Sequence, residues 1–351
     1  MYDPIITDRY LVCQVYLELL NIIVLKIHQI KKLHIELTTK CNARCPLCMR
    51  NYLGYDFNSG YPLIELSLSQ IKHILPSSFL HQIQYTLING NLGDFGLARD
   101  ALEIVNYLVQ NDVDVEISTN GSMRSQDWWA QLAHPRVTVG FALDGLEDTH
   151  KQYRQDTDWH RIIDNAKAFI AAGGSAVWRF APFEHNKHQE DECKKLSQSL
   201  GFKDFWNIHD GRDQGPVYSR QGQFVRWLGR ENPSPPPIKD MLESHLSWGN
   251  DHINLSSLKD KINTKISCRS LEGEIYIAAD GSVYPCCYMG FYPTQMIHPG
   301  NTQLKKIVKE NNALEYSLEH CLTWFNQIET TWKLPSIAQG RLYTCVESCG
   351  Y

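Results

Sequence analysis

The sequence predicts an α/β fold in which six β/α units form a partial, open barrel, followed by a small C-terminal α+β region. Between residues 33 and 210, short β-rich runs alternate with segments of helical period. Strands that alternate with helices pair in parallel through right-handed crossovers. Six units are too few for a closed eight-stranded barrel, so we expect an open one.

The strand and helix segments follow each other regularly along this part of the chain. The expected strands are Leu33–Thr38, Ile83–Ile88, Val113–Ser118, Val137–Leu143, Ala176–Pro182 and Phe205–Ile208. The expected helices are Leu66–Leu75, Gly96–Gln110, Gln126–Leu132, His160–Ala172 and Gln189–Leu200. Gly173 and Gly201 follow two of these helices, where glycine suits a left-handed cap. The loops after the strands are where parallel barrels carry their chemistry.

The last third of the chain has a different composition. Residues 210–265 are rich in Gly, Pro and polar side chains, which predicts a linker or bridging region. The stretch 273–287 alternates apolar residues around Asp280-Gly281 and predicts a hairpin, with helices near Leu304–Ile328. The expected divisions are an N-terminal extension, the barrel, the linker and the C-terminal region, at 1–32, 33–210, 211–265 and 266–351.

Composition narrows the possible partners. The chain has 351 residues and a net charge of −5, and no basic stripe that would follow a phosphate backbone, so we expect no nucleic acid partner. Residues 11–26 are the one apolar candidate for a signal or membrane segment. Glu18 and Asn21 interrupt this run and no basic leader precedes it, so we expect an amphipathic element and no membrane association. These features predict a cytoplasmic protein.

The eleven cysteines are unevenly placed. Cys41, Cys45 and Cys48 lie within eight residues, in "TTKCNARCPLCMRN", directly after the first expected strand. Clustered thiols in the cytosol more often bind metal than form disulfides. Structural zinc usually takes four ligands from two separated pairs, whereas three thiolates leave one metal position open for reaction. Thiolate ligands favour an iron–sulfur cluster or zinc.

This C-x3-C-x2-C loop after the first strand of a six-unit β/α chain resembles the radical S-adenosylmethionine (radical SAM) superfamily. The resemblance implies that Cys41, Cys45 and Cys48 hold a [4Fe–4S] cluster whose open iron chelates SAM. It also implies reductive cleavage of SAM to a 5′-deoxyadenosyl radical, with electrons from a donor such as flavodoxin or ferredoxin. Leu47 stands where the family often has an aromatic residue, which affects only adenine packing.

The resemblance extends to the loop after the second strand. Relatives have Gly-Gly-Glu-Pro there and use it to meet the SAM ammonium group, whereas this chain has "NGNLGD" at 89–94. Gly90 keeps the close approach that glycine permits. Asn91 replaces the acid without its charge, and Asp94 is a candidate to restore that charge. The alternative is a tight turn that contacts no ligand.

Three other strand ends provide candidate SAM or substrate contacts. Asn120, in "STNG", and Asp144, in "ALDG", resemble the family's polar positions, although Ala142 replaces a common serine. A turn-forming role explains each of them equally well. Arg179 would be a costly charge inside a barrel unless paired, and we expect it to meet the SAM carboxylate. A salt bridge with Glu116 is the alternative for Arg179.

A second thiol group occupies the C-terminal region. The C-x12-G-x4-C spacing of Cys268, Gly281 and Cys286 resembles the twitch and SPASM extensions of radical SAM enzymes. The long middle run of SPASM cysteines is missing, so the resemblance implies the shorter twitch form with one auxiliary [4Fe–4S] cluster. Its expected ligands are Cys268, Cys286, Cys345 and Cys349. Among the remaining thiols, Cys321 is a rival ligand, although its helical run favours a buried structural thiol. Cys287 adjoins a ligand, and Cys13 and Cys193 are expected to be packing residues.

Relatives with such extensions often modify ribosomally made peptides (RiPP maturation), by crosslinking or by excising part of a residue. We therefore expect an oxidoreductase-type peptide maturase with a precursor peptide as substrate. About 32 residues precede the first barrel strand, too few for a leader-recognition domain, so a separate small recognition protein is an expected partner. The alternatives are a dehydrogenase or rearrangement enzyme acting on a sugar or cofactor precursor, and a non-catalytic zinc protein.

Overall fold

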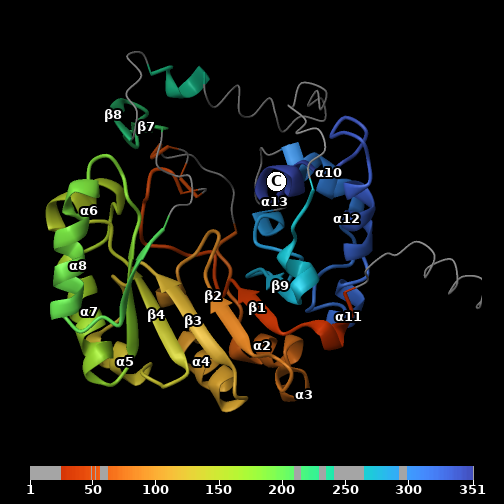
Figure 1. The fold of residues 1–351 in the computed structure, drawn as a ribbon, viewed down its shortest axis with the longest axis horizontal. Helices are drawn as coiled ribbons and strands as arrows, with labels where there is room; N and C mark the ends of the chain where they lie inside the picture. The colour runs from red at the N-terminus through yellow and green to blue at the C-terminus, as the bar shows by residue number, and fades with distance from the viewer. Residues whose placement is uncertain are drawn as a thin grey trace, which may run out of the picture.

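The computed structural model places a curved, mostly parallel sheet at the centre of the molecule (Figure 1). It describes residues 25–48, 50–51, 53–55, 62–208, 215–228, 235–240, 265–291 and 299–350. The six barrel strands are β1 (Lys32–Ile35), β2 (Tyr85–Ile88), β3 (Asp114–Thr119), β4 (Val137–Ala142), β5 (Ser175–Phe180) and β6 (Asp204–Asn207). They are parallel and adjacent in chain order, which confirms the predicted open arrangement of six units.

Helices cover the outer side of this sheet (Figure 1). They are α2 (Leu68–Ile74), α3 (Ser77–Leu80), α4 (Ala101–Gln110), α5 (Gln126–Gln131), α6 (Glu147–Tyr153), α7 (Trp159–Ala171) and α8 (Glu190–Ser199), with short 3-10 turns η1 (Ile27–Gln29), η2 (Phe95–Leu97) and η3 (Lys187–Gln189). Ser67, Ser125 and Asp158 cap α2, α5 and α7 with side-chain oxygens. Gly173 and Gly201 have φ of +89° and +84°, as expected for glycines that follow helix ends.

The C-terminal region completes the same sheet. The predicted hairpin is present as β9 (Glu274–Ile277) and β10 (Val283–Tyr284), with Gly281 at φ +86° in the turn. β9 pairs in parallel with β1, from Lys32 opposite Glu274 to Ile35 opposite Ile277. The sheet therefore has eight strands in the order β10-β9-β1-β2-β3-β4-β5-β6. The remaining elements are η5 (Arg269–Glu272), η6 (Met289–Phe291), α10 (Pro299–Ile307), α11 (Leu318–Cys321), α12 (Phe325–Trp332) and α13 (Tyr343–Cys349).

A second, two-stranded sheet lies within the stretch predicted as a linker. β7 (Gly215–Tyr218) pairs antiparallel with β8 (Phe224–Leu228). Val217 and Leu228 of this hairpin are buried together with Cys45. The stretch thus contains an element that packs on the cysteine loop, although 231–234 of its proline-rich run lie outside the described residues.

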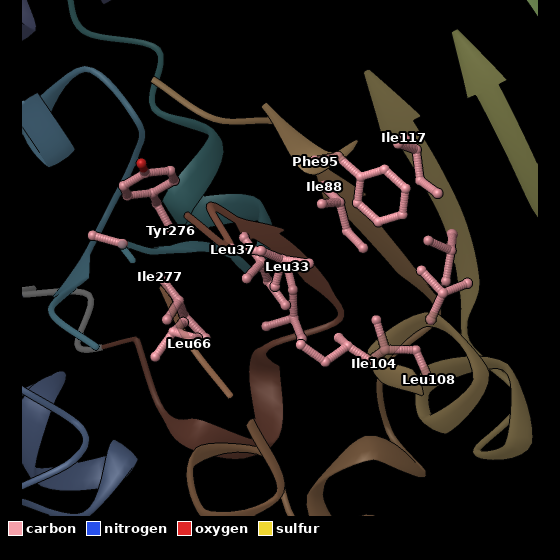
Figure 2. Close-up of a cluster of buried hydrophobic side chains, with 14 of the residues drawn as sticks. Leu33, Leu37, Leu66, Ile88, Phe95, Ile104, Leu108, Ile117, Tyr276 and Ile277 are labelled. Carbon is pink, nitrogen blue, oxygen red and sulfur yellow. The ribbon is translucent and has the colours of Figure 1, made fainter. Parts of the chain in front are cut away.

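One hydrophobic core joins the barrel to the C-terminal region (Figure 2). Figure 2 shows Tyr276 and Ile277 of β9 in the same cluster as Leu33 of β1 and Leu37 just after it. All four side chains are almost completely buried. The two parts therefore share apolar contacts that stabilise both. Within the described ranges, no helix is both long and apolar enough to cross a membrane. The expected helix at 11–26 falls almost entirely on residues that are not described.

Candidate functional site

Three free thiols lie on one loop that follows β1. Cys45 is buried, and Cys41 and Cys48 are partly buried. The Cys48 amide donates to the Cys45 carbonyl at 3.1 Å, which makes a tight turn between the second and third thiols. The Arg44 amide donates to the Gln155 carbonyl at 2.9 Å and so ties the loop to the segment after α6. The loop is therefore held at the carboxyl end of the parallel strands, where barrel sites form.

The electrostatics of these thiols favour a cationic partner. Burial raises the pKa of the Cys41 thiol, and the Asp94 carboxylate, Cys48 and Cys45 raise it further. Three thiolates this close repel one another and are desolvated. A bound metal centre offsets both effects, since a coordinating thiol is deprotonated. The donor set thus fits the iron–sulfur cluster that the family resemblance implies.

Two side chains direct N–H groups at the thiols. Asn120 Nδ2 lies 3.9 Å from Cys41 Sγ and 3.0 Å from Asn42 Oδ1. Arg154 Nη1 lies 3.7 Å from Cys45 Sγ. The structure therefore places Asn120 beside the cysteine loop, as expected of a site residue. Arg154 was not predicted from the sequence, where its signal was a basic residue ten positions after Asp144.

Asp144 supports Arg154. Its carboxylate is fully buried, with Oδ2 2.5 Å from Arg154 Nε and Oδ1 accepting from the Ala181 amide at 2.7 Å. Asp144 therefore bridges the ends of β4 and β5 and aims a guanidinium at the cysteine loop. Both the turn-forming and the functional interpretations of "ALDG" are compatible with this position, and its assignment to a SAM contact stays a prediction.

A buried acid that was not predicted from the sequence holds the loop after β2 through hydrogen bonds. Glu36 is buried just after β1, and its Oε1 accepts from the amides of Leu92 and Gly93 at 2.6 and 3.0 Å. Its Oε2 accepts from the Tyr276 hydroxyl at 2.8 Å. A side chain at Gly90 would place its Cβ 2.3 Å from the Gly93 carbonyl oxygen, so only glycine fits there.

Asn91 and Asp94 have partners within the protein. Asn91 Nδ2 donates to the Cys287 carbonyl at 2.7 Å. The buried Asp94 carboxylate accepts from Thr119 Oγ1 at 2.9 Å, from the Asn120 amide at 2.7 Å and from the Gly96 amide at 2.9 Å. Burial raises its pKa although all three donors lower it. Asp94 therefore fixes the position of Asn120, and its contact with SAM stays a prediction.

Arg179 lies on β5 and points toward β3. Its Nη1 is 3.9 Å from Glu116 Oε1, and Glu116 also accepts from the Tyr85 hydroxyl at 2.8 Å. This is the ion pair that the sequence offered as the alternative. The assignment of Arg179 to the SAM carboxylate stays a prediction.

The four predicted C-terminal ligands come from separate segments that meet. Cys268 precedes η5, Cys286 follows β10, and Cys345 and Cys349 lie on α13. The Ser267 amide donates to the Cys349 carbonyl at 3.0 Å, which places Cys268 beside the end of α13. Burial raises the pKa of the Cys286 thiol, and Cys287, Cys345 and Cys268 raise it further. Cys349 in turn raises the pKa of the Cys268 and Cys345 thiols.

The other cysteines occupy different environments. Cys321 on α11 and Cys193 on α8 are fully buried in the core, as expected for packing residues. Cys287 presents its carbonyl to Asn91. In the described part of the chain, no three Cys, His, Asp or Glu side chains converge to hold a single metal ion. Cluster ligands are spaced around several irons, so the assignment of both thiol groups depends on their pattern and on the family resemblance.

Comparisons with known proteins agree with this fold and loop. Residues 35–190, which include all three loop cysteines, match the family profile described as the radical SAM superfamily. This part of the chain is thus similar to the radical SAM superfamily, and SAM and an iron–sulfur cluster are the cofactors that this family uses.

Curated relatives are distant. The chain is 23% identical over 274 residues to a cysteine-type anaerobic sulfatase-maturating enzyme of Clostridium novyi, with 71% of each chain covered. It is 27% identical over 209 residues to the mycofactocin maturase MftC of Mycobacterium tuberculosis, with 55% of this chain and 50% of that protein covered. The match therefore spans only half the length of MftC.

Solved structures have the same fold. Streptococcus suis SuiB bound to the precursor peptide SuiA superposes with a TM-score of 0.55 and 13% identity, over 90% of this chain and 76% of SuiB. The enzyme anSMEcpe, bound to AdoMet and a Cp18Cys peptide, has a TM-score of 0.52 and 15% identity, with 91% of each chain covered. At these identities the likeness shows the fold alone.

Proposed function

We propose that this protein is a radical SAM maturase that abstracts hydrogen from a precursor peptide and so crosslinks, excises or otherwise modifies it. The observation that carries the proposal is the partly buried loop of Cys41, Cys45 and Cys48 at the carboxyl end of the parallel strands. The peptide substrate is supported by relatives and structural neighbours, several of which are named as maturases or hold a peptide.

The residues of the site would act on SAM and on its cluster. Cys41, Cys45 and Cys48 would hold the [4Fe–4S] cluster by three corners. When bound, the cluster and SAM supply the radical chemistry, and the protein orients them and excludes water. The loop at 89–94, which is hydrogen-bonded to Glu36, would contact SAM. Asn120, on the neighbouring strand end, would contact SAM from the side.

The C-terminal thiols would hold one auxiliary [4Fe–4S] cluster of the twitch type. The proposal is supported by the electrostatic effect of these thiols on one another, since Cys345 and Cys268 raise the pKa of Cys286, and Cys268 and Cys349 raise that of Cys345. Thiolate ligation at all four corners suits electron transfer rather than substrate binding. A small recognition protein and a flavodoxin-like or ferredoxin-like donor are the partners that this chemistry would need.

Anaerobic reconstitution tests the proposal. We expect roughly eight iron atoms per wild-type chain, for two four-iron clusters, and 5′-deoxyadenosine when SAM and a reductant are added. Cys45→Ala should abolish that product, whereas Cys193→Ser, at another buried thiol, should retain it. Cys286→Ala should keep roughly four irons and some SAM cleavage but lose turnover of the peptide. A wild-type chain that binds zinc and no iron would refute the proposal.

A further inference from the structure

A buried ion pair lies against one of the three loop thiols. Arg154 Nη1 is 3.7 Å from Cys45 Sγ, and Arg154 Nε is 2.5 Å from Asp144 Oδ2. We propose that Arg154 is a positioning residue that raises the reduction potential of the SAM-binding cluster through a charge-assisted N–H···S hydrogen bond to Cys45, and that Asp144 limits this effect. The inference rests on the proposed function, because it requires the loop thiols to hold a cluster.

The guanidinium is fixed in this orientation from several sides. Asp144 is completely buried, and its second oxygen is bonded to the Ala181 amide at 2.7 Å, so the carboxylate cannot turn away. The Arg154 amide donates to the His150 carbonyl at 2.9 Å, and the Arg154 Cζ lies 5.5 Å from the centre of the Tyr153 ring. A donor held this firmly keeps one Nη group directed at sulfur, at a distance suited to the large sulfur atom.

The charge of Arg154 acts more strongly on the reduced cluster. Reduction adds one negative charge to the cluster and its thiolates, so a nearby cation stabilises the reduced form more than the oxidised form. Hydrogen bonds to cluster sulfurs change the potential in the same direction. The Arg154 side chain is 17% exposed and Cys45 is 6% exposed, so water and salt screen their interaction only weakly. Arg154 therefore favours reduction, the step that SAM cleavage requires.

The loop thiols differ in the N–H donors that face them. Cys45 faces a charged donor, whereas Cys41 faces the neutral amide of Asn120 at 3.9 Å. Arg179, an arginine on β5, lies 3.9 Å from the Glu116 carboxylate. Arg154 thus meets a loop thiol, and Asp144 is the counter-charge on its far side. The positive end of this ion pair faces the sulfur, so the pair as a whole still raises the reduction potential.

The test is a redox titration of the reconstituted enzyme without SAM, followed by the electron paramagnetic resonance signal of the reduced cluster. Arg154→Gln should disfavour reduction at least ten-fold, which is 59 mV for a one-electron couple. Asp144→Asn keeps an acceptor for the Ala181 amide but removes the counter-charge, so it should shift the midpoint potential upward. Arg136→Gln removes a surface arginine that pairs with Asp114 at 2.8 Å and should leave the midpoint unchanged.

Arg154→Gln and Asp144→Asn should shift the midpoint potential in opposite directions, which separates an electrostatic effect from damage to the fold. If the Arg154→Gln variant loses its iron, the midpoint potential of Asp144→Asn alone tests the inference, and an upward shift supports it. Midpoints that stay at the wild-type value, or move downward in both variants, would overturn the inference. So would an Arg154→Gln chain whose midpoint is unchanged but whose SAM affinity falls, since Arg154 would then act on SAM. A wild-type chain without any cluster signal would instead defeat the proposed function.

Discussion

Two buried histidines near the site make the stability of the folded protein sensitive to acid. His34 on β1 contacts the Asn89 carbonyl through Nε2 at 2.8 Å, and His150 on α6 accepts from the Asp144 amide through Nδ1 at 3.2 Å. His150 Nε2 also faces Thr157 Oγ1 at 3.1 Å. Burial lowers the pKa of each imidazole to about 4, from an ordinary value of 6.5. Both side chains are therefore neutral in the folded protein at pH 7.

Because the pKa of each imidazole is lower in the folded chain than its ordinary value, the folded state loses stability as the pH falls from about 6.5 toward about 4. The unfolded chain binds protons that the folded chain cannot, so the stability present above pH 6.5 disappears on acidification. At pH 5 the loss is roughly 2 kcal/mol for each histidine. We expect a double variant, His34→Gln with His150→Gln, to show a smaller fall in melting temperature between pH 7 and pH 5 than wild type. An equal fall in both proteins would contradict this origin.

At the residue scale, the sequence predicted which positions lie near the cysteine loop but not all of their partners. Cys41 and Asn120 were expected in the site, and they lie 3.9 Å apart through Sγ and Nδ2. Asn91 was a candidate SAM contact, with a ligand-free turn as the alternative, and its side-chain amide donates to the Cys287 carbonyl, nearly two hundred positions away. Glu36 and Arg154 were missed. Their roles depend on neighbours from other strands, which local patterns do not reveal.

At the element scale, the strongest sequence signals were periodic runs and turn residues. All six barrel strands begin within two residues of the expected position, because each is a short apolar run with flanking turn signals. The Asp280-Gly281 turn was likewise predicted. The helix α6 and the β7–β8 hairpin were not, since α6 is short and polar and the hairpin lies in a Gly- and Pro-rich stretch. The parallel pairing of β9 with β1 joins segments far apart in the sequence and has no local signal.

That pairing makes the C-terminal region part of the barrel core, with a consequence for stability. Ile277 on β9 is completely buried in the cluster that contains Leu33 of β1 (Figure 2). Ile277→Ala should cost roughly 2–5 kcal/mol. Hydrogen–deuterium exchange should then accelerate in β1 and β2 as well as in β9, because they form one core. Leu271→Ala, at a 38% exposed side chain, is the control and should change little. Acceleration confined to 265–350 would indicate two independent cores.

At the scale of the whole molecule, the two thiol groups are connected through the loop after β2. The Asp94 amide donates to the Lys40 carbonyl at 2.8 Å, next to Cys41. At the other end of this loop, Asn91 donates to the Cys287 carbonyl at 2.7 Å, next to Cys286. The Glu36 carboxylate joins the same loop to Tyr276 of β9. The segment expected to lie under SAM is thus held by both the cysteine loop and the C-terminal hairpin.

Substitution at Asn91 tests whether this position serves the C-terminal hairpin or SAM. Asn91→Ala and Asn91→Asp both lose the amide donor to Cys287, and the aspartate adds a repulsive oxygen facing that carbonyl. If the hydrogen bond positions the loop, both variants should weaken SAM binding by roughly ten-fold, which is about 1.4 kcal/mol. Both should also speed amide exchange at 286–291.

The aspartate variant distinguishes the two roles because it restores the acid that relatives place in this loop. An Asn91→Asp chain that binds SAM as tightly as wild type, or more tightly, would show that a charge facing the ammonium group matters more than the bond to Cys287. Asn111→Ala is the matched control, since it removes an equivalent amide-to-carbonyl bond of 2.8 Å at the end of α4. Because that helix end lies away from both thiol groups, SAM affinity and exchange at 286–291 should be unchanged.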